Sequence, residues 1–199
     1  IVGGCTVTTA GGPKGIGCNS YFTQVQKSTI GAAGAPGAFT ATGAGTQMQL
    51  SAGIAAFGLT YYGGFIYLAG GANATNPQES VIKRAKIDAS GNVVNVTSGL
   101  ASGTWTNAAG SMSQPRRRTV AYVVNGYLYV IGGHNAADTT GPPGGASGTT
   151  YGDIQIGKID LSSGSTGDIA SFTKSSTSTL TARWNPAVAF GNGFMYVTG

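Results

Sequence analysis

A short pattern recurs along this 199-residue chain and restricts its fold more than any other feature. Each copy has a turn glycine, a strand of alternating aromatic and aliphatic residues, and closing glycines. The copies span residues 64–71, 126–133 and 193–199. A partial copy at the start of the chain ends in Gly3 and Gly4, and the second glycines at positions 4, 71 and 133 are 67 and 62 residues apart. Self-similarity at this period predicts one supersecondary unit, built several times and stacked on its neighbours.

The residues around each glycine pair predict four short antiparallel strands per repeat. Asn125-Gly126 and Asn192-Gly193 lie between apolar runs and are strong hairpin signals, because both residue types tolerate positive φ. The expected first strands are 54–57, 120–124 and 187–190; the third are 21–29, 81–87 and 154–159; the fourth lie near Phe39, at 93–96 and at 169–172. No segment sustains an apolar period of 3.6 residues, so we expect almost no helix. Four-stranded units repeated in sequence are typical of a β-propeller.

The segment from Tyr129 to Gly133 resembles the Kelch motif, which has an aromatic-hydrophobic strand and a double glycine. Arg116 and Arg183 resemble the arginine that precedes the first strand in that family, whereas the first repeat has Ile54 there. Trp105 resembles the downstream tryptophan of the family. The third-strand ends at 86–88 and 158–160 are similar to Kelch-like repeats of large bacterial surface proteins.

The repeat and this resemblance together predict an all-β fold, a Kelch-like β-propeller segment. We expect one unit over residues 1–199 with repeats at about 5–71, 72–133 and 134–199, which is two whole blades plus two half blades. The expected structural repeat positions are Gly3, Gly4, Tyr67, Gly70, Gly71, Arg116, Tyr129, Gly132, Gly133, Arg183, Tyr196 and Gly199. The tyrosines are expected in the core between blades. Because propellers close with four to eight blades, we expect the sequence to be part of a longer chain.

The two cysteines predict a local disulfide. Cys5 and Cys18 enclose a segment rich in turn-forming glycines, and a small-residue, low-charge chain of this kind suits an oxidising, extracellular setting. Two free, buried thiols are the alternative. No second cysteine pair or histidine pair is present, so no metal site is expected. We therefore expect a secreted or cell-surface protein.

The charge of the chain argues against a nucleic-acid partner, and its hydropathy argues against a membrane-spanning helix. The net charge of +5 comes from 6 acidic residues against 11 basic ones, and the one dense basic patch is Arg116 to Arg118. Nucleic-acid binders carry a broader basic stripe, so no nucleic-acid partner is expected. No run of 18 apolar residues occurs, so no membrane-spanning helix is expected.

The connection between the second and third strands differs most among repeats, at 5–20, 72–80 and 134–151. Such loops emerge on one face of a propeller and often form its binding surface. His134, Asn135 and Asp138 are therefore candidate binding residues, and a solvated spacer loop is the alternative. Arg117 is a further candidate, because a guanidinium can hold an acidic sugar or phosphate through two hydrogen bonds. Arg116, which has an equivalent in Arg183, is expected to be structural.

No catalytic residues and no cofactor are predicted. The chain has one histidine and no Gly-x-Ser-x-Gly elbow, and its acids are scattered. The expected function is a non-catalytic extracellular module for adhesion, for glycan or protein binding, or for scaffolding, with a protein, a glycan or neighbouring copies as partners. One alternative is part of a carbohydrate-active Kelch-type enzyme whose catalytic residues lie outside this segment. Another is a component of a viral fibre or extracellular filament.

Overall fold

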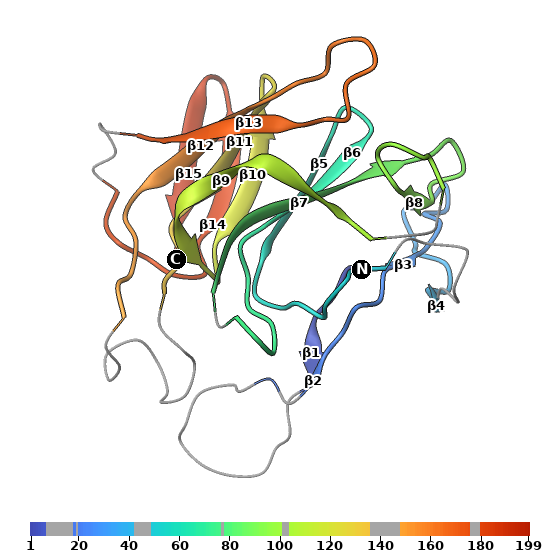
Figure 1. The fold of residues 1–199 in the computed structure, drawn as a ribbon, viewed down its shortest axis with the longest axis horizontal. Helices are drawn as coiled ribbons and strands as arrows, with labels where there is room; N and C mark the ends of the chain where they lie inside the picture. The colour runs from blue at the N-terminus through green and yellow to red at the C-terminus, as the bar shows by residue number, and fades with distance from the viewer. Residues whose placement is uncertain are drawn as a thin grey trace.

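The computed structural model describes residues 1–6, 18, 20–41, 49–76, 78–100, 104–135, 148–175 and 180–199. These residues contain no helix, and their strands form antiparallel sheets, so the all-β prediction is confirmed. The sheets lie next to one another in a curved row, and Figure 1 shows their order from the N-terminal region to the C-terminal hairpin.

Two sheets contain most of the strands. The first sheet contains β5 (Gly58–Tyr62), β6 (Phe65–Ala69), β7 (Glu79–Ile87), β8 (Val93–Val94) and β9 (Thr106–Arg116). The second sheet contains β10 (Val120–Val124), β11 (Tyr127–Ile131), β12 (Ile154–Ile159) and β13 (Ile169–Lys174). Neighbours along the chain are neighbours in each sheet, except that β8 and β9 both pair with β7.

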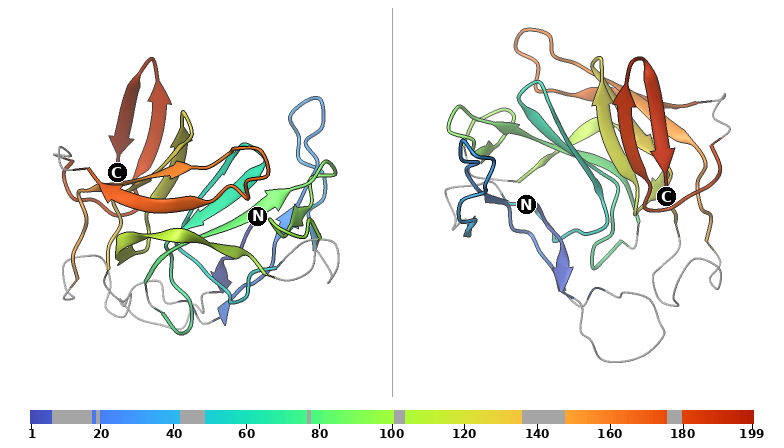
Figure 2. Two further views of the ribbon diagram at one scale, coloured as in Figure 1. Left: turned by 45° about the horizontal axis from the view of Figure 1, so that its top comes forward. Right: turned by 180° about the vertical axis from the view of Figure 1, so that it is seen from behind.

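Smaller pieces flank these two sheets. The C-terminal hairpin contains β14 (Ala187–Gly191) and β15 (Phe194–Thr198). The N-terminal region contains β1 (Cys5–Thr6), β2 (Ser20–Tyr21), β3 (Gln26–Lys27) and β4 (Thr40–Ala41). Residues 1–4 run antiparallel to residues 22–26, with Val2 opposite Val25. The hairpins β5–β6, β10–β11 and β14–β15 lie side by side with their turns at one edge (Figures 1 and 2).

The three hairpin turns have the backbone that their sequences predict. Asn125 and Gly126 have φ of 51° and 79°, and Asn192 and Gly193 have φ of 50° and 80°. Two consecutive positive φ values are the mark of the type I′ turn, whose twist matches that of the flanking strands. The turn at residues 63–64 has the same signs. The turn residues thus set the register of each hairpin.

The predicted first strand at 54–57 is wrong, because the strand begins at Gly58. Ala56 has φ of 57°, which is incompatible with a strand, and Ala55 instead forms an isolated bridge with Ala72. Residues 54–57 are apolar because part of this segment packs in the core, where Ile54 is 1% exposed.

The long strand β9 was not predicted. Residues 106–110 are Thr, Asn, Ala, Ala and Gly, which have low strand propensity apart from Thr, so the sequence gives little signal there. The strand forms because β7 pairs with it, and its Gly110 packs closely on Ser171 of β13. The fourth strand expected near Phe39 is reduced to β4, and the Phe39 side chain is 47% exposed.

Each glycine pair connects one unit to the next through the backbone. The N–H groups of Gly4, Gly71 and Gly133 donate to the carbonyls of Ile54, Arg116 and Arg183 at 2.8, 2.9 and 2.9 Å. The first glycine of each pair lies against the same carbonyl, so that a Cβ at Gly3, Gly70 or Gly132 would overlap it. All six glycines have positive φ. Glycine is required here both by backbone conformation and by the close approach.

A second series of backbone contacts runs between the segments that lead into the first strand of each hairpin, residues 54–57, 116–119 and 183–186, which we call the link segments. The Arg118 N–H donates to the Ala56 carbonyl at 2.6 Å, and the Asn185 N–H donates to the Arg118 carbonyl at 2.7 Å. Ala56, Arg118 and Asn185 occupy equivalent places, and their φ values are 57°, 52° and 55°. The same unusual conformation thus recurs at three points of the chain, each bonded to the next.

The core lies between neighbouring units in two clusters. One lies between the first and second sheets and includes Phe65, Tyr67, Leu128, Val130 and Ile169. The other lies between the N-terminal region and the first sheet and includes Val2, Val25, Ile54, Leu68 and Trp105. Tyr67 is fully buried and donates its hydroxyl to the Gly167 carbonyl at 2.9 Å, and burial raises the pKa of this phenol.

The equivalent tyrosines are not all in the core. Tyr129 is half-buried beside Phe190 at a centroid distance of 5.7 Å, and Tyr196 is 59% exposed. The expectation that the tyrosines pack between units therefore holds for Tyr67 and is wrong for Tyr196. In the described part of the chain, the hairpin β14–β15 has no sheet on its Tyr196 face.

The contact at the glycine pair can be tested with two matched alanine variants. Gly70 and Gly64 both have positive φ, but a Cβ at Gly64 meets no atom within 4 Å. Gly70→Ala is expected to lower the free energy of unfolding by about 1–3 kcal/mol more than Gly64→Ala, because only Gly70→Ala also forces the carbonyl of Arg116 away. Urea unfolding followed by tryptophan fluorescence measures this difference. Equal losses would show that the close approach contributes nothing.

Candidate functional site

A buried ion pair anchors the edge of the second sheet opposite its hairpin turn. Arg116 Nη1 donates to Asp153 Oδ1 at 2.7 Å and Nη2 donates to Oδ2 at 3.1 Å, with both side chains almost fully buried. The guanidinium also donates to the Gly132 carbonyl at 3.0 Å and lies 4.4 Å above the Tyr151 ring centre. Gln155 Nε2 donates to Asp153 at 2.7 Å, so the carboxylate is closely surrounded by donors.

The environment of Asp153 lowers its pKa. Burial acts to raise the pKa, but the hydrogen bond and charge of Arg116 outweigh this, with help from Gln155 and Lys174. Because the folded pKa lies below the unfolded value, this carboxylate contributes stability that is present above the unfolded pKa and lost as pH falls through the folded pKa.

Asp153→Asn is expected to lower the free energy of unfolding at pH 7 by about 3 kcal/mol, because it leaves the buried Arg116 charge uncompensated. The difference between wild type and variant should shrink as pH falls below about 4, where the carboxylate of the unfolded wild type takes up a proton. It should disappear once the pH lies below the lowered pKa of the folded carboxylate. Denaturant unfolding at several pH values measures both. Asp160→Asn is the control, because exposed Asp160 accepts the Ser162 N–H in a turn that an asparagine oxygen can also form. A pH-independent loss at Asp153 would contradict the ion-pair account.

Arg183 repeats the contacts of Arg116. Arg116 Nε donates to the Gln114 carbonyl at 3.5 Å and Arg183 Nε to the Thr181 carbonyl at 3.0 Å. Arg183 Nη1 donates to the Gly199 carbonyl at 3.3 Å, which corresponds to the bond from Arg116 to Gly132. Both arginines therefore tie the link segment to the closing glycine of their own hairpin.

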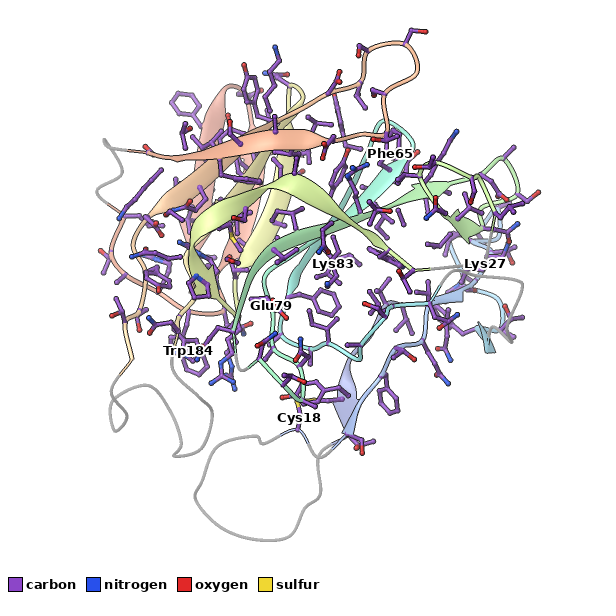
Figure 3. All side chains as sticks on the ribbon, in the orientation of Figure 1. Cys18, Lys27, Phe65, Glu79, Lys83 and Trp184 are labelled. Carbon is purple, nitrogen blue, oxygen red and sulfur yellow. A yellow bond between two sulfur atoms is a disulfide. The ribbon has the colours of Figure 1, made fainter. Side chains whose placement is uncertain are left out.

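Arg117 and Arg118 lie on the link segment beside an aromatic cluster. Arg117 is 4% exposed, and its backbone forms a two-way bridge with His134 at 3.0 Å in each direction. The Arg118 guanidinium lies 4.5 Å over the Trp184 ring, and the His134 ring meets the edge of Trp184 at 5.7 Å. Figure 3 shows Trp184 at the edge opposite Phe65, on the same side as Cys18 and Glu79. We call Arg117, Arg118, His134 and Trp184 the link cluster.

A shallow groove of about 490 Å³ lies next to this cluster, between the end of β9 and the ends of the second sheet. Its polar lining residues include Gln114, Thr149, Thr150, Tyr151, Asp153 and Lys174. The Gln114 Oε1 atom is buried and has no hydrogen-bond donor among the described residues. Lys174 Nζ lies at the rim, 3.8 Å from Asp153 Oδ2. The groove is therefore lined by an amide side chain, hydroxyls and one exposed cation.

The candidate binding residues predicted from the sequence have different places. His134 forms a backbone bridge with Thr150, and the Asn135 N–H donates to the Thr149 carbonyl at 3.1 Å. Both residues therefore hold Thr149 and Thr150, which line the groove. Asn135 is also held by its side chain, whose Oδ1 accepts the Thr149 N–H at 2.6 Å. Arg117 is buried in the link cluster. Asp138 lies outside the described residues.

Sequence reasoning missed the groove residues Gln114 and Lys174. Gln114 lies on β9, which was not predicted because its first residues have low strand propensity. Lys174 is the last residue of β13, two residues beyond the end of the predicted strand. It also missed a polar contact between sheets, in which Arg84 donates to the Thr166 carbonyl at 2.6 Å and pairs with Asp168 at 3.2 Å. The Lys-Ile-Asp sequence that recurs at 86–88 and 158–160 does not indicate this contact between the sheets.

The predicted disulfide is present, and joins Cys5 to Cys18. A disulfide of this kind suggests an oxidising environment. Among the residues described, no three His, Cys, Asp or Glu side chains gather closely enough to hold a metal ion. The same residues include no helix long and apolar enough to cross a membrane.

Comparison with known proteins gives a likeness of fold alone. No family model and no curated protein matches the chain. Among solved structures, one titled "Structure of YjhT" is similar, with a TM-score of 0.51 and 15% sequence identity. The match covers 77% of this chain and 36% of that one, so this chain spans about a third of the protein that it resembles. The Kelch resemblance of the glycine-pair strands therefore remains a prediction.

Proposed function

We propose that this chain is a Kelch-like propeller segment that acts outside the cell as a non-catalytic binding module, with a glycan as its ligand. The glycan binds in the groove between β9 and the second sheet, next to the link cluster. The observation that carries the proposal is the polar lining of this groove, where the unpartnered Gln114 oxygen lies near threonine residues and the Lys174 ammonium.

The threefold contact at the glycine pairs supports a propeller arrangement. Successive units are joined by the same bond from a glycine N–H to the carbonyl at position 54, 116 or 183. When each unit contacts the next in the same way, each is rotated relative to its neighbour by a similar angle. A row of sheets related by such a rotation curves about an axis. The bonded positions Ala56, Arg118 and Asn185 would then lie nearest that axis.

The chemistry of the groove supports a sugar rather than an apolar ligand. Sugar hydroxyls both donate and accept, and the groove is lined by the Gln114 amide side chain, threonine residues and a cation that suits a carboxylate or a hydroxyl. Asp153, which lines the groove, is held in place by its buried ion pair with Arg116. Because the groove is shallow, a chain of sugars that lies across it fits better than a small enclosed molecule.

The acids of the described residues support a non-catalytic role. Asp153 and Asp168 are paired with arginines, Glu79 accepts from Asn73 and Asn76, and Asp88 and Asp160 accept backbone N–H groups in turns. The pKa of Asp88 and that of Asp160 are lowered, chiefly by the N–H groups of Asn92 and Ser162. Each of these carboxylates thus has a structural partner, and the lowered pKa values of Asp88, Asp153 and Asp160 do not suit a general acid.

A binding experiment tests the proposal. An array of neutral and uronic-acid-containing oligosaccharides identifies a ligand, and isothermal titration then measures its Kd. Gln114→Ala and Lys174→Gln are each expected to weaken binding about tenfold, because each removes one hydrogen bond to the ligand, in the second case from a charged donor.

Lys158→Gln is the matched control, because Lys158 is an exposed lysine of the same sheet that does not line this groove. It should leave Kd unchanged, and all three variants should keep the wild-type unfolding midpoint. The proposal fails if no oligosaccharide binds, or if the groove variants and the control bind equally well.

A further inference from the structure

The groove between β9 and the second sheet contains two opposite charges that differ in their access to a ligand. Among the described residues that line it, Asp153 and Lys174 are the charged ones. The Asp153 side chain is 7% exposed, whereas that of Lys174 is 54% exposed. A ligand that enters the groove therefore meets the ammonium group and touches little of the carboxylate.

The charge of Asp153 is already neutralised within the protein. Arg116 donates to both carboxylate oxygens, and Gln155 donates to one of them. The ion pair of Arg116 with Asp153 has no net charge, so Lys174 adds a positive charge at the rim that this pair does not balance. An anionic group on a ligand would balance it through a charge-assisted hydrogen bond.

The hydrogen-bond donors of Lys174 are available to a ligand. Its Nζ atom lies 3.8 Å from Asp153 Oδ2, which is beyond hydrogen-bond length, and no described residue accepts a hydrogen bond from it. The hydroxyls of Thr149 and Thr150, which line the same groove, also form no hydrogen bond with a described residue. An anionic group accepts hydrogen bonds and donates none, so it matches a groove that offers these donors.

We propose that the sugar residue bound beside Lys174 is anionic and carries a carboxylate or a sulfate ester. This inference rests on the proposed function and adds to it the class of glycan. A neutral sugar that covers Lys174 would remove water from the ammonium without supplying a countercharge, and covering a charge in this way costs affinity. An anionic sugar supplies the countercharge and accepts hydrogen bonds from the ammonium at the same time.

A second hollow of similar size in the same sheet lacks this imbalance of charge. It has a volume of about 510 Å³, lies beside the turn between β12 and β13, and is lined by Lys158 and Asp160 among other residues. Both of these side chains are exposed, so the positive charge has an equally accessible negative charge beside it. The excess of accessible positive charge thus distinguishes the groove at Lys174 from the hollow at Lys158.

Matched pairs of oligosaccharides test the class of glycan. Those from polygalacturonate and hyaluronan carry carboxylates, and each is compared with its own carboxyl-reduced form. Those from κ-carrageenan carry sulfate esters and are compared with their desulfated form. In isothermal titration with the wild-type chain, the anionic member of at least one pair is expected to bind about tenfold more tightly than its neutral member, because neutralisation removes a charge-assisted hydrogen bond. The two kinds of pair distinguish a carboxylate from a sulfate ester.

Variants of the protein test the residue that recognises the anion. Lys174→Gln is expected to abolish the preference for the anionic member, whereas Lys174→Arg is expected to retain it. Lys158→Gln is the matched control and should retain the full preference, because Lys158 lines the other hollow. Added sodium chloride should reduce the preference of the wild type, because salt screens an exposed charge. All three variants should keep the wild-type unfolding midpoint.

The outcomes separate this inference from the proposed function. The anionic class is wrong if the neutral members bind as tightly as the anionic ones, if only neutral oligosaccharides of the array bind, or if Lys174→Gln keeps the preference. In each of these cases the glycan site itself still stands or falls with Gln114→Ala. If no oligosaccharide of any kind binds, the proposed function fails and the anionic class fails with it.

Discussion

The close approach of a glycine pair to a backbone carbonyl is the contact on which the rest of the structure depends. It joins residues 1–4 to the segment before β5, the end of β6 to the segment before β10, and the end of β11 to the segment before β14, with nearly equal bond lengths. Because the contact uses backbone atoms, it is the same in every unit although the neighbouring side chains differ. The side chains then fill the space that this spacing leaves, with Tyr67 and Leu68 on opposite faces of one strand and in different core clusters.

Side-chain chemistry differs between units at the position that supplies the carbonyl. Ile54 has an apolar side chain and lies in a core cluster, whereas Arg116 is fully buried and neutralised by Asp153. A buried arginine requires such a partner, since an isolated charge in the interior costs far more than a surface ion pair contributes. The residue that bonds the first closing glycine differs accordingly. It is the apolar Val81 in the unit that has Ile54, and the acidic Asp153 in the unit that has Arg116. The ion pair is a local feature of one unit, and the backbone contact is general.

Strong local signals predicted the hairpins well. Asn-Gly turns and alternating strands specify backbone conformation within a few residues, so β10, β12 and the glycine pairs were found from the sequence. Prediction failed where long-range pairing decides the structure. Residues 54–57 have the composition of a strand but form a link segment, because Ala56 is held in a left-handed conformation by the next unit. β9 has weak propensity and exists because β7 pairs with it. Its residue Gln114 lines the groove, so the candidate site was missed for the same reason.

The three link positions with positive φ have a consequence for how this architecture can diversify. Ala56, Arg118 and Asn185 adopt the same conformation without being glycine, so each carries a side chain at a point where neighbouring units are joined through the backbone. An alanine, an arginine and an asparagine are all accommodated there, because the hydrogen bonds that join these positions to one another use main-chain atoms. Mutation can therefore change the chemical character of these junctions one unit at a time without breaking the backbone hydrogen bonds that join the units.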